Sequence, residues 1–170
     1  MIDKDIDTGG IMLRQECRIS ETDTAGDLHD KLMPIGADLV VQTVEGIIEK
    51  NIETRVQRSF IQGSEVLKSA PKLTRELCHI DWNDSTRSIY NLIRGLSPYP
   101  AAFTELVKGE KIQQMKIYVS EKVKGEDYSH LLEAAGHNSP VLPGSILSDG
   151  KNFLAVAASD GAVSIKELQL

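Results

Sequence analysis

Asp7 is the residue of this chain whose type and position most clearly allow catalysis. It stands directly before Thr8, Gly9 and Gly10, where a carboxylate at a turn can orient a histidine and stabilise its cationic form. Aspartate before Thr-Gly is also a common turn pairing, in which the carboxylate only accepts backbone hydrogen bonds. From the residues around Asp7 alone, the turn interpretation is the more common one.

Histidines and cysteines, the other residue types that often do chemistry, are scattered along the chain. None of them has the spacing of a metal site, of a nucleophile and its base, or of a dense disulfide framework. We therefore expect no metal, reduced thiols, and histidines with surface or structural roles. These residues are His29, His79, His130, His137, Cys17 and Cys78.

Six basic residues are candidates for RNA contact, because phosphate contacts need only mobile cations. Residues 1–60 hold 7 Lys or Arg against 12 Asp or Glu and carry −5, while residues 61–170, with 12 against 13, carry −1. Neither part is as basic as an autonomous nucleic-acid-binding domain, and a solvated surface would contain the same lysines. Because only 5% of residues are aromatic, we expect contacts with the RNA backbone. The candidates are Lys68, Lys72, Arg75, Lys108, Lys111 and Lys116.

A helix followed by a strand is predicted in the middle of the chain. Ser85 is a good N-cap residue, four apolar residues then form one stripe at helical spacing, and Gly95 and Pro98 end the helix. A strand is predicted over residues 101–107, after a turn stiffened by two prolines. The stripe consists of Ile89, Leu92, Ile93 and Leu96.

The rest of the C-terminal half predicts a small β-domain. Short apolar segments are separated by turn residues, among them the hairpin pairs Asp149-Gly150 and Asp160-Gly161. Five short strands with such turns favour a small closed or partly open barrel, since closure removes exposed edges. The additional strands are predicted over residues 111–119, 144–147, 152–157 and 161–168, and a long loop over residues 122–140.

The N-terminal third predicts a strand over residues 11–19 and an amphipathic helix over residues 25–49, with a kink or a break near Pro34 and Gly36. One strand and one helix cannot cover both faces of a sheet, so this β-α segment is interpreted as part of a larger layered structure. Its apolar surface over residues 11–50 then needs a partner: a second copy by self-association, the rest of a parent chain, or the downstream domain.

Two stretches resemble the methionyl-tRNA formyltransferase family. Ile80-Asp81-Trp82, the short helix after it, and Ser97-Pro98-Tyr99-Pro100 resemble the opening of the C-terminal domain of that family. Far upstream, Ile6 to Met12 and the following Glu21 to Leu32 resemble the end of its catalytic domain. Two matches in the right order and at a plausible separation are much more specific than either one alone.

The resemblance implies an α+β chain in which a remnant β-α segment of a Rossmann-like formyltransferase domain precedes a small OB-like β-barrel with one packed helix. It implies a catalytic remnant at residues 1–60, a linker at residues 61–77 and the OB-like domain at residues 78–170. It also implies that Asp7 is the catalytic aspartate of the family, which works with an asparagine and a histidine.

The family reaction moves a formyl group from 10-formyltetrahydrofolate to the amino group of methionyl initiator tRNA in translation initiation. The resemblance therefore implies initiator tRNA as partner, a missing N-terminal catalytic part, and no DNA. We expect a cytoplasmic protein without a membrane segment, because no apolar run is long enough to span a bilayer and no signal peptide opens the chain. We expect no folate or metal on this part, because no Asn-x-His precedes Asp7 and the Ser-Leu-Leu-Pro donor motif of the family is absent. Catalytic inactivity of this part alone is the corresponding prediction.

Two alternatives stay open at this point. The chain is compatible with a stand-alone RNA-binding or interaction module that never catalyses. It is equally compatible with part of a sugar-nucleotide formyltransferase, because that architecture is shared with the methionyl-tRNA enzymes.

Overall fold

The computed structural model describes most of the chain. Some residues of the predicted catalytic remnant (1–60) and of the predicted linker (61–77) lie outside the described residues, so these domain boundaries remain predictions. The residues that are not described are 1–3, 5–6, 62 and 64–67.

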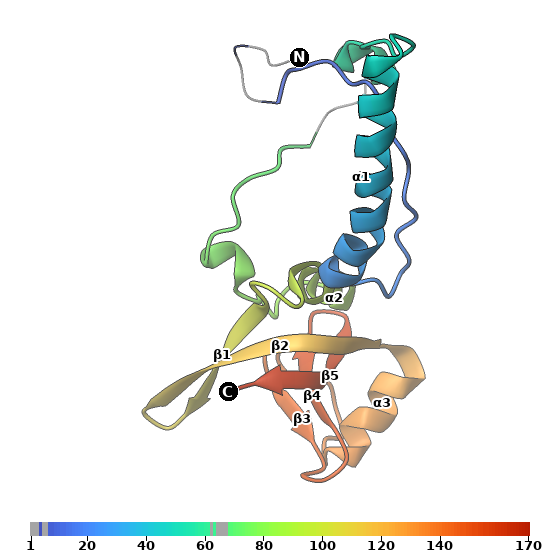
Figure 1. Cartoon of the computed structure of the whole chain (residues 1–170). Helices are drawn as coiled ribbons and strands as arrows, with labels where there is room; N and C mark the ends of the chain where they lie inside the picture. The colour runs from blue at the N-terminus through green and yellow to red at the C-terminus, as the bar shows by residue number, and fades with distance from the viewer. Residues whose placement is uncertain (1–3, 5–6, 62, 64–67) are drawn as a thin grey trace. The chain divides into compact units, whose positions relative to one another are not determined.

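The chain forms two compact units (Figure 1). The first consists of residues 1–20 and 27–72, and the second of residues 21–26 and 73–170. Residues 21–26 are held in the second unit by helix α2, Thr86–Leu96, where Tyr90 Oη donates to Glu21 O at 3.2 Å and Arg94 Nη1 donates to Asp23 O at 2.9 Å. The second unit thus includes a short piece from early in the sequence.

Helix α1, Ala25–Ile48, begins in the second unit and continues into the first. The predicted helix is confirmed, and the predicted break is wrong, because α1 runs through Pro34 and Gly36. Proline removes one backbone hydrogen bond but has a helical φ, so the turns on either side can sustain the helix. The end of α1 is tightly packed, since a Cβ on Gly46 would lie 2.9 Å from Ile52 Cβ.

The strand predicted over residues 11–19 is wrong. This segment makes a single isolated bridge, in which Ile11 and Arg55 exchange two backbone hydrogen bonds of 2.8 and 2.9 Å. A strand needs a partner along its length to satisfy its backbone groups, and the described residues of the first unit provide one for Ile11 alone. A short 3₁₀ helix, Gln57–Phe60, follows this bridge.

The second unit is built on an open antiparallel sheet with the strand order β1-β2-β5-β4-β3. The five predicted strands are confirmed with shifted ends, and because β1 and β3 form the two edges, the predicted barrel is partly open. Ile80 N donates to Phe103 O at 2.8 Å and so covers part of the β1 edge. The strands are β1 Ala102–Lys108, β2 Lys111–Val123, β3 Ile146–Ser148, β4 Leu154–Ala158 and β5 Gly161–Gln169.

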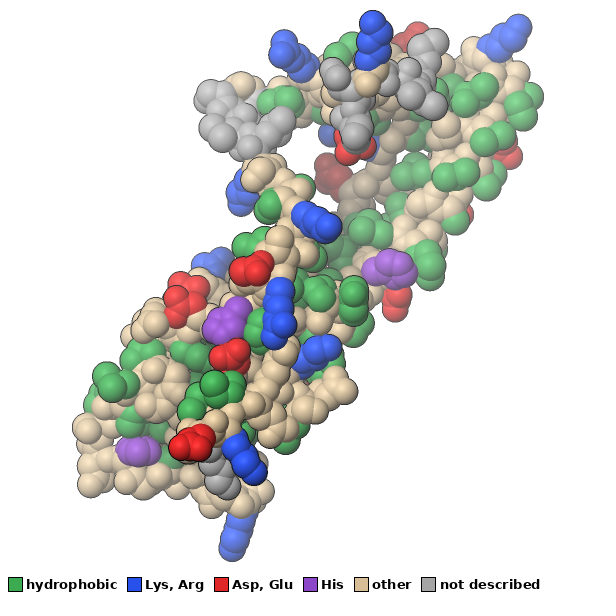
Figure 2. Space-filling model, turned by 90° about the vertical axis from the view of Figure 1, so that its left-hand side faces the viewer, with side chains coloured by type: hydrophobic (Ala, Val, Ile, Leu, Met, Phe, Trp, Pro, Cys, Tyr) green, Lys and Arg blue, Asp and Glu red, His purple; other side chains and the backbone are tan. Residues whose placement is uncertain are grey.

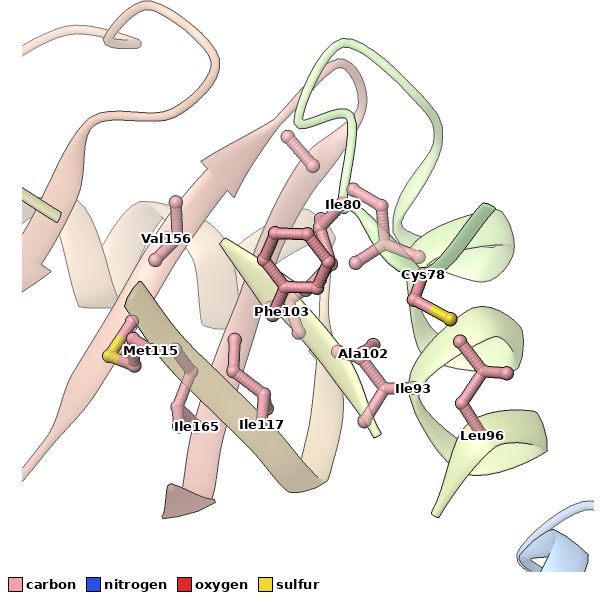
Figure 3. Packing of buried hydrophobic residues seen from close by; sticks show 13 residues of the cluster. Cys78, Ile80, Ile93, Leu96, Ala102, Phe103, Met115, Ile117, Val156 and Ile165 are labelled. Atoms are coloured by element: carbon pink, nitrogen blue, oxygen red, sulfur yellow. The ribbon is translucent and has the colours of Figure 1, made fainter. Parts of the chain in front are cut away.

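Both faces of this sheet are covered, and each has its own core. Helix α2 packs on one face, where its apolar stripe meets buried side chains of β1, β2, β4 and β5 (Figure 3). The alternation along the strands sends neighbouring residues to the two faces: Val156 and Val163 belong to the α2 side, and Ala155 and Ala162 to the other. This second core contains Leu132 of helix α3, Gly125–Ala134.

The prediction of a long loop over residues 122–140 is wrong, because helix α3 lies within it. The sheet therefore has two packed helices, whereas the sequence predicted only one. Strand β2 continues to Val123, and α3 follows immediately. Tyr128, Leu131 and Leu132 do have helical spacing, but the segment is short and is bounded by Gly125 and Gly136, both at positive φ. Burial of Leu132 against the sheet supplies the stabilisation that the local sequence lacks.

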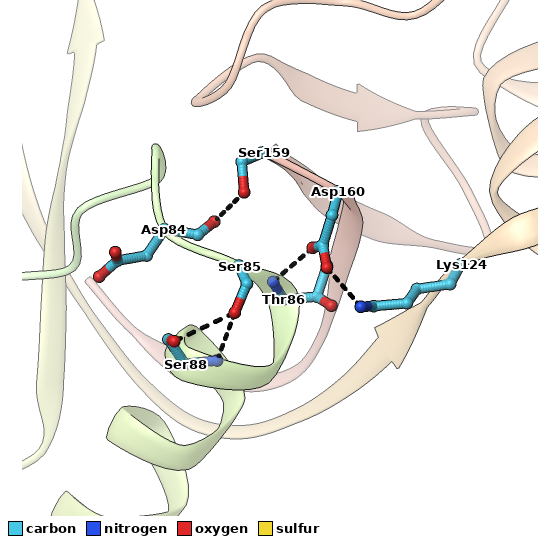
Figure 4. Close-up of polar contacts among 7 residues, drawn as sticks. All are labelled: Asp84, Ser85, Thr86, Ser88, Lys124, Ser159 and Asp160. Atoms are coloured by element: carbon cyan, nitrogen blue, oxygen red, sulfur yellow. Dashed lines mark hydrogen bonds and ion pairs between the residues drawn. The ribbon is translucent and has the colours of Figure 1, made fainter.

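The N-terminus of α2 is bound to the turn between β4 and β5 (Figure 4). Ser85 Oγ accepts from Ser88 N at 3.1 Å, as predicted for an N-cap, and the Asp160 carboxylate accepts from Thr86 N at 2.7 Å. Asp160 also forms an ion pair with Lys124. The Lys124 ammonium and the Thr86 N–H lower the pKa of Asp160, because both stabilise its charged form.

Replacing Asp160 by Ala should therefore destabilise the second unit by about 1 kcal/mol, which is typical of a lost helix cap. Because the pKa of Asp160 is lower in the folded than in the unfolded chain, its contribution is present above the unfolded pKa of about 4 and is lost as the pH falls further. Fluorescence of the single tryptophan, Trp82, during urea unfolding at pH 7 and pH 3 measures both effects. Equal losses at the two pH values, or a similar loss in the exposed-carboxylate control Glu167→Gln, would contradict this assignment.

Candidate functional site

Asp7 lies in a turn of the first unit that is closed by Gln57. The Gln57 amide nitrogen, Nε2, donates to Asp7 O at 2.7 Å and to Gly9 O at 2.8 Å. Asp7 has a φ of 61°, and its side chain is exposed. The two hydrogen bonds fix the backbone of the turn and leave the carboxylate accessible.

Gly10 allows this turn to approach the neighbouring segment. A Cβ at this position would overlap Thr54 Cγ2 and lie 3.3 Å from Arg55 O. Any other residue must therefore displace the Thr54 side chain or push the two segments apart. This close approach, which the sequence alone does not reveal, sets the position of Asp7 relative to residues 54–57.

The predicted cations are only partly brought together. Arg75 and Lys116 line one hollow of the second unit, and Lys108 and Lys111 pair across the end of the β1–β2 hairpin. Lys68 and Lys72 are exposed residues of the first unit. On the face drawn in Figure 2, basic and acidic side chains are interspersed, in agreement with the absence of a strongly basic footprint in the sequence.

The hollow has a volume of about 370 Å³ and holds Arg75 in a defined place. The Arg75 guanidinium carbon lies 5.4 Å from the centre of the Phe103 ring, and Nη2 donates to Gln114 Oε1 at 3.1 Å. Lys116 of β2 pairs with Phe103 of β1, so their side chains lie on the same face of the β1–β2 hairpin. The hollow is lined by Leu73, Thr74, Arg75, Cys78, Pro100, Ala101, Phe103, Gln114 and Lys116.

Two carboxylates limit the positive charge around this hollow. Glu76 follows Arg75 in sequence, and Glu105 is the ladder partner of Gln114. A hydrogen bond from the Thr74 side chain is the main cause that lowers the pKa of Glu76, with a smaller contribution from Arg75. Glu76 is therefore ionised at neutral pH, and the hollow is a site with two cations inside and acidic residues nearby.

Gln57, Phe103 and Gln114 were not predicted as site residues. Gln114 and Phe103 follow from the hairpin register, in which the turn at Gly109 pairs Phe103 with Lys116 and Glu105 with Gln114. That register was in principle readable from the Lys108-Gly109-Glu110 turn. The role of Gln57 depends on a contact fifty residues away along the chain, for which no local pattern exists.

The described part of the chain shows no group of three or more His, Cys, Asp or Glu side chains placed to share a metal ion. Among the helices that the structure describes, none has the length and apolarity required to cross a bilayer. His29 bonds to its neighbour Asp30, and the ring of His79 packs edge-on against Phe103. Cys17 and Cys78 are both free thiols.

An open five-stranded antiparallel sheet with a helix on each face, preceded in the chain by helix α1, defines an α+β protein of the OB-like class. Residues 72–170 match the family described as "Formyl transferase, C-terminal domain". The chain belongs to this formyltransferase family.

Relatives that are similar along almost the whole chain are methionyl-tRNA formyltransferases. The enzyme of Azobacteroides pseudotrichonymphae is 44% identical over 99% of this chain and 49% of its own length. Those of Bacteroides fragilis and Acetivibrio thermocellus are 43% and 38% identical over 98% of this chain, and 48% and 47% of their own lengths. The chain thus spans about half the length of the curated relatives it matches.

Two solved structures share the fold. A variant of HypX from Aquifex aeolicus superposes with a TM-score of 0.65 at 14% identity, over 98% of this chain and 26% of HypX. The N-formyltransferase from Helicobacter canadensis, in complex with folinic acid and dTDP-3-aminofucose, gives a TM-score of 0.60 at 20% identity, over 99% of this chain and 53% of that enzyme. At such identities the likeness shows the fold alone.

Replacing Gly10 by Ala should loosen the turn that carries Asp7, because the new methyl group would overlap Thr54. Forced overpacking costs about 1–3 kcal/mol, so exchange of the Ile11 and Arg55 amides, which bond across the bridge, should accelerate about tenfold or more. Hydrogen exchange read by NMR measures this. Gly36→Ala is the control, since nothing lies within 4 Å of its Cβ position; unchanged protection in Gly10→Ala would show that the approach is not restrictive.

Proposed function

We propose that this chain is the C-terminal half of a methionyl-tRNA formyltransferase. The whole enzyme transfers the formyl group of 10-formyltetrahydrofolate to the amino group of methionyl initiator tRNA. The amine nitrogen bonds to the formyl carbon, the bond from that carbon to the folate nitrogen breaks, and the proton lost by the amine is balanced by one that the folate nitrogen gains. The observation that carries this proposal is the 40–44% identity to such enzymes along nearly the whole chain.

In this proposal Asp7 is the chain's contribution to the reaction centre. Amide formation needs a neutral amine, a route for its proton and donors for the oxyanion. An exposed carboxylate on a fixed turn suits the first two requirements when a histidine of the other half lies beside it. The chain contains neither the Asn-x-His sequence nor the donor motif of the family, so it should not catalyse alone.

The exposed face of α1 supports the presence of a partner for the first unit. Leu32, Met33, Val40, Val41, Val44, Ile47 and Ile48 of this helix are between 43% and 74% exposed. Burying one such side chain contributes about 1.5–3 kcal/mol. A surface that covered this face of the helix would therefore stabilise the first unit substantially. The N-terminal catalytic half supplies that covering surface in the whole enzyme. When this half is absent, the chain self-associates through residues 11–50.

The second unit is proposed to hold initiator tRNA, with the six cations predicted from the sequence as its contacts. The separate positions of these cations and the acidic residues among them favour a few phosphate contacts and no base readout. The proposed boundaries remain residues 1–60, 61–77 and 78–170. A cytoplasmic location follows from this function.

A second candidate, part of a sugar-nucleotide formyltransferase, is favoured by the shared fold with the Helicobacter canadensis enzyme. A stand-alone RNA-binding module is the third. The sequence identity is much higher to the methionyl-tRNA enzymes, 44% against 20%, which is why the first candidate is preferred.

A chimera tests the proposal directly. The N-terminal half of the Bacteroides fragilis enzyme, fused ahead of this chain, should formylate methionyl-tRNA with 10-formyltetrahydrofolate, and the 170-residue chain alone should not. In the chimera Asp7→Asn should lower kcat about 10²–10⁴-fold, as for other groups that orient a catalytic histidine.

Asp30→Asn, which alters an exposed carboxylate of α1, is the matched control and should leave kcat unchanged. Formylation of dTDP-3-aminofucose in place of methionyl-tRNA would favour the second candidate. Turnover by the chain alone, or full activity of the Asp7→Asn chimera, would contradict the assignment.

A further inference from the structure

Two contacts hold Arg75 in place in the second unit. Its guanidinium lies over the Phe103 ring at 5.4 Å and is fixed in rotation by the 3.1 Å hydrogen bond to Gln114. Phe103 is itself rigid, because it is 6% exposed and its ring also contacts His79 at 5.2 Å. A guanidinium on an aromatic face keeps its planar fork oriented at a lower entropic cost than a free side chain.

Among the described residues, Arg75 uses only a small part of its hydrogen-bonding capacity. A guanidinium has five N–H donors, and the hydrogen bond to Gln114 occupies one of them. Within the described residues, no carboxylate lies within ion-pair distance of Arg75 or Lys116. Two cations that line the same hollow without an anion between them are therefore available to an incoming anionic group.

The dimensions and surroundings of the hollow limit the anion. Its volume of about 370 Å³ exceeds that of a single phosphate group and leaves room for the sugar attached to it. The apolar side chains of Leu73, Pro100 and Phe103 line the remaining wall. Glu76 and Glu105 nearby would repel a second anionic group, so the charges suit one phosphate and not a run of them.

We propose that Arg75 binds one phosphodiester group of the RNA through its guanidinium fork, that Lys116 is the second cation of this site, and that Gln114 and Phe103 are positioning residues for Arg75. This inference rests on the proposed function and names one place where the second unit contacts the tRNA. Bidentate contacts between guanidinium and phosphate are geometrically specific, whereas the exposed Lys111 at the hairpin end can act only as a point charge. The site therefore fixes the register of the bound strand in addition to attracting it.

The test is fluorescence anisotropy of labelled initiator tRNA with the 170-residue chain at several salt concentrations. For Arg75→Ala we expect about tenfold weaker binding and a slope of log K against log salt that is smaller by about 1, since one phosphate contact is lost. Arg75→Lys keeps the charge and should keep the slope, but without the fork it should bind about three- to tenfold more weakly.

Gln114→Leu separates positioning from charge. It should leave the salt slope unchanged and weaken binding severalfold, because the guanidinium loses its orientation while the number of cations stays the same. A role in folding alone would not produce this combination, and urea unfolding followed by Trp82 fluorescence checks each variant. Lys151→Ala removes an exposed cation that lines a different hollow and should change neither quantity.

The outcomes distinguish the inference from the function on which it rests. If the wild-type chain binds tRNA and Arg75→Ala has the same affinity and salt slope, the inference is wrong and the proposed function stands. If Lys151→Ala weakens binding as much as Arg75→Ala does, the contact is a general attraction and the site is wrong. If the wild-type chain shows no binding to tRNA at low salt, the tRNA-holding role of the second unit is wrong, and the inference with it.

Discussion

An amphipathic element must bury its apolar side, and the two units of this chain satisfy that requirement to very different degrees. In the second unit, α2 covers one face of the sheet and α3 the other, so that two cores are closed within one hundred residues or so of chain. In the first unit, α1 exposes a row of large aliphatic side chains, with Ile48 at 74%. The second unit is complete, and the first has a surface that needs a partner.

Asp7 and the hollow around Arg75 lie in different units, and this difference determines how each is held. The turn of Asp7 depends on contacts with residues 54–57 of the same incomplete unit, and the acid itself remains exposed. The hollow around Arg75 is built on a finished sheet, where the β1–β2 register and the buried Phe103 determine its geometry. The proposed function assigns RNA contact to the complete second unit and a part in the reaction to the exposed Asp7 of the first unit.

Sequence reasoning succeeded where the signal is local. The helical spacing of Ile89 and Ile93 and the N-cap Ser85 predicted α2, and turn residues predicted the strands, because these patterns act within a few residues. The strand over residues 11–19 was wrong because a strand depends on a partner that local sequence does not specify. Helix α3 was missed because its stability comes from burial of Leu132, and the contact between Arg75 and Gln114 spans 39 positions.

Hydrogen exchange of the 170-residue chain, with light scattering on the same sample, tests most directly whether the first unit lacks a partner. The account predicts that amides of Leu39 to Ile48 exchange at least about a hundredfold faster than those of β2 and β5, since local opening should be easy where few apolar contacts form. Addition of the separately produced N-terminal half of a methionyl-tRNA formyltransferase should then protect them. A strictly monomeric chain in which these α1 amides are already as protected as the sheet would contradict the account.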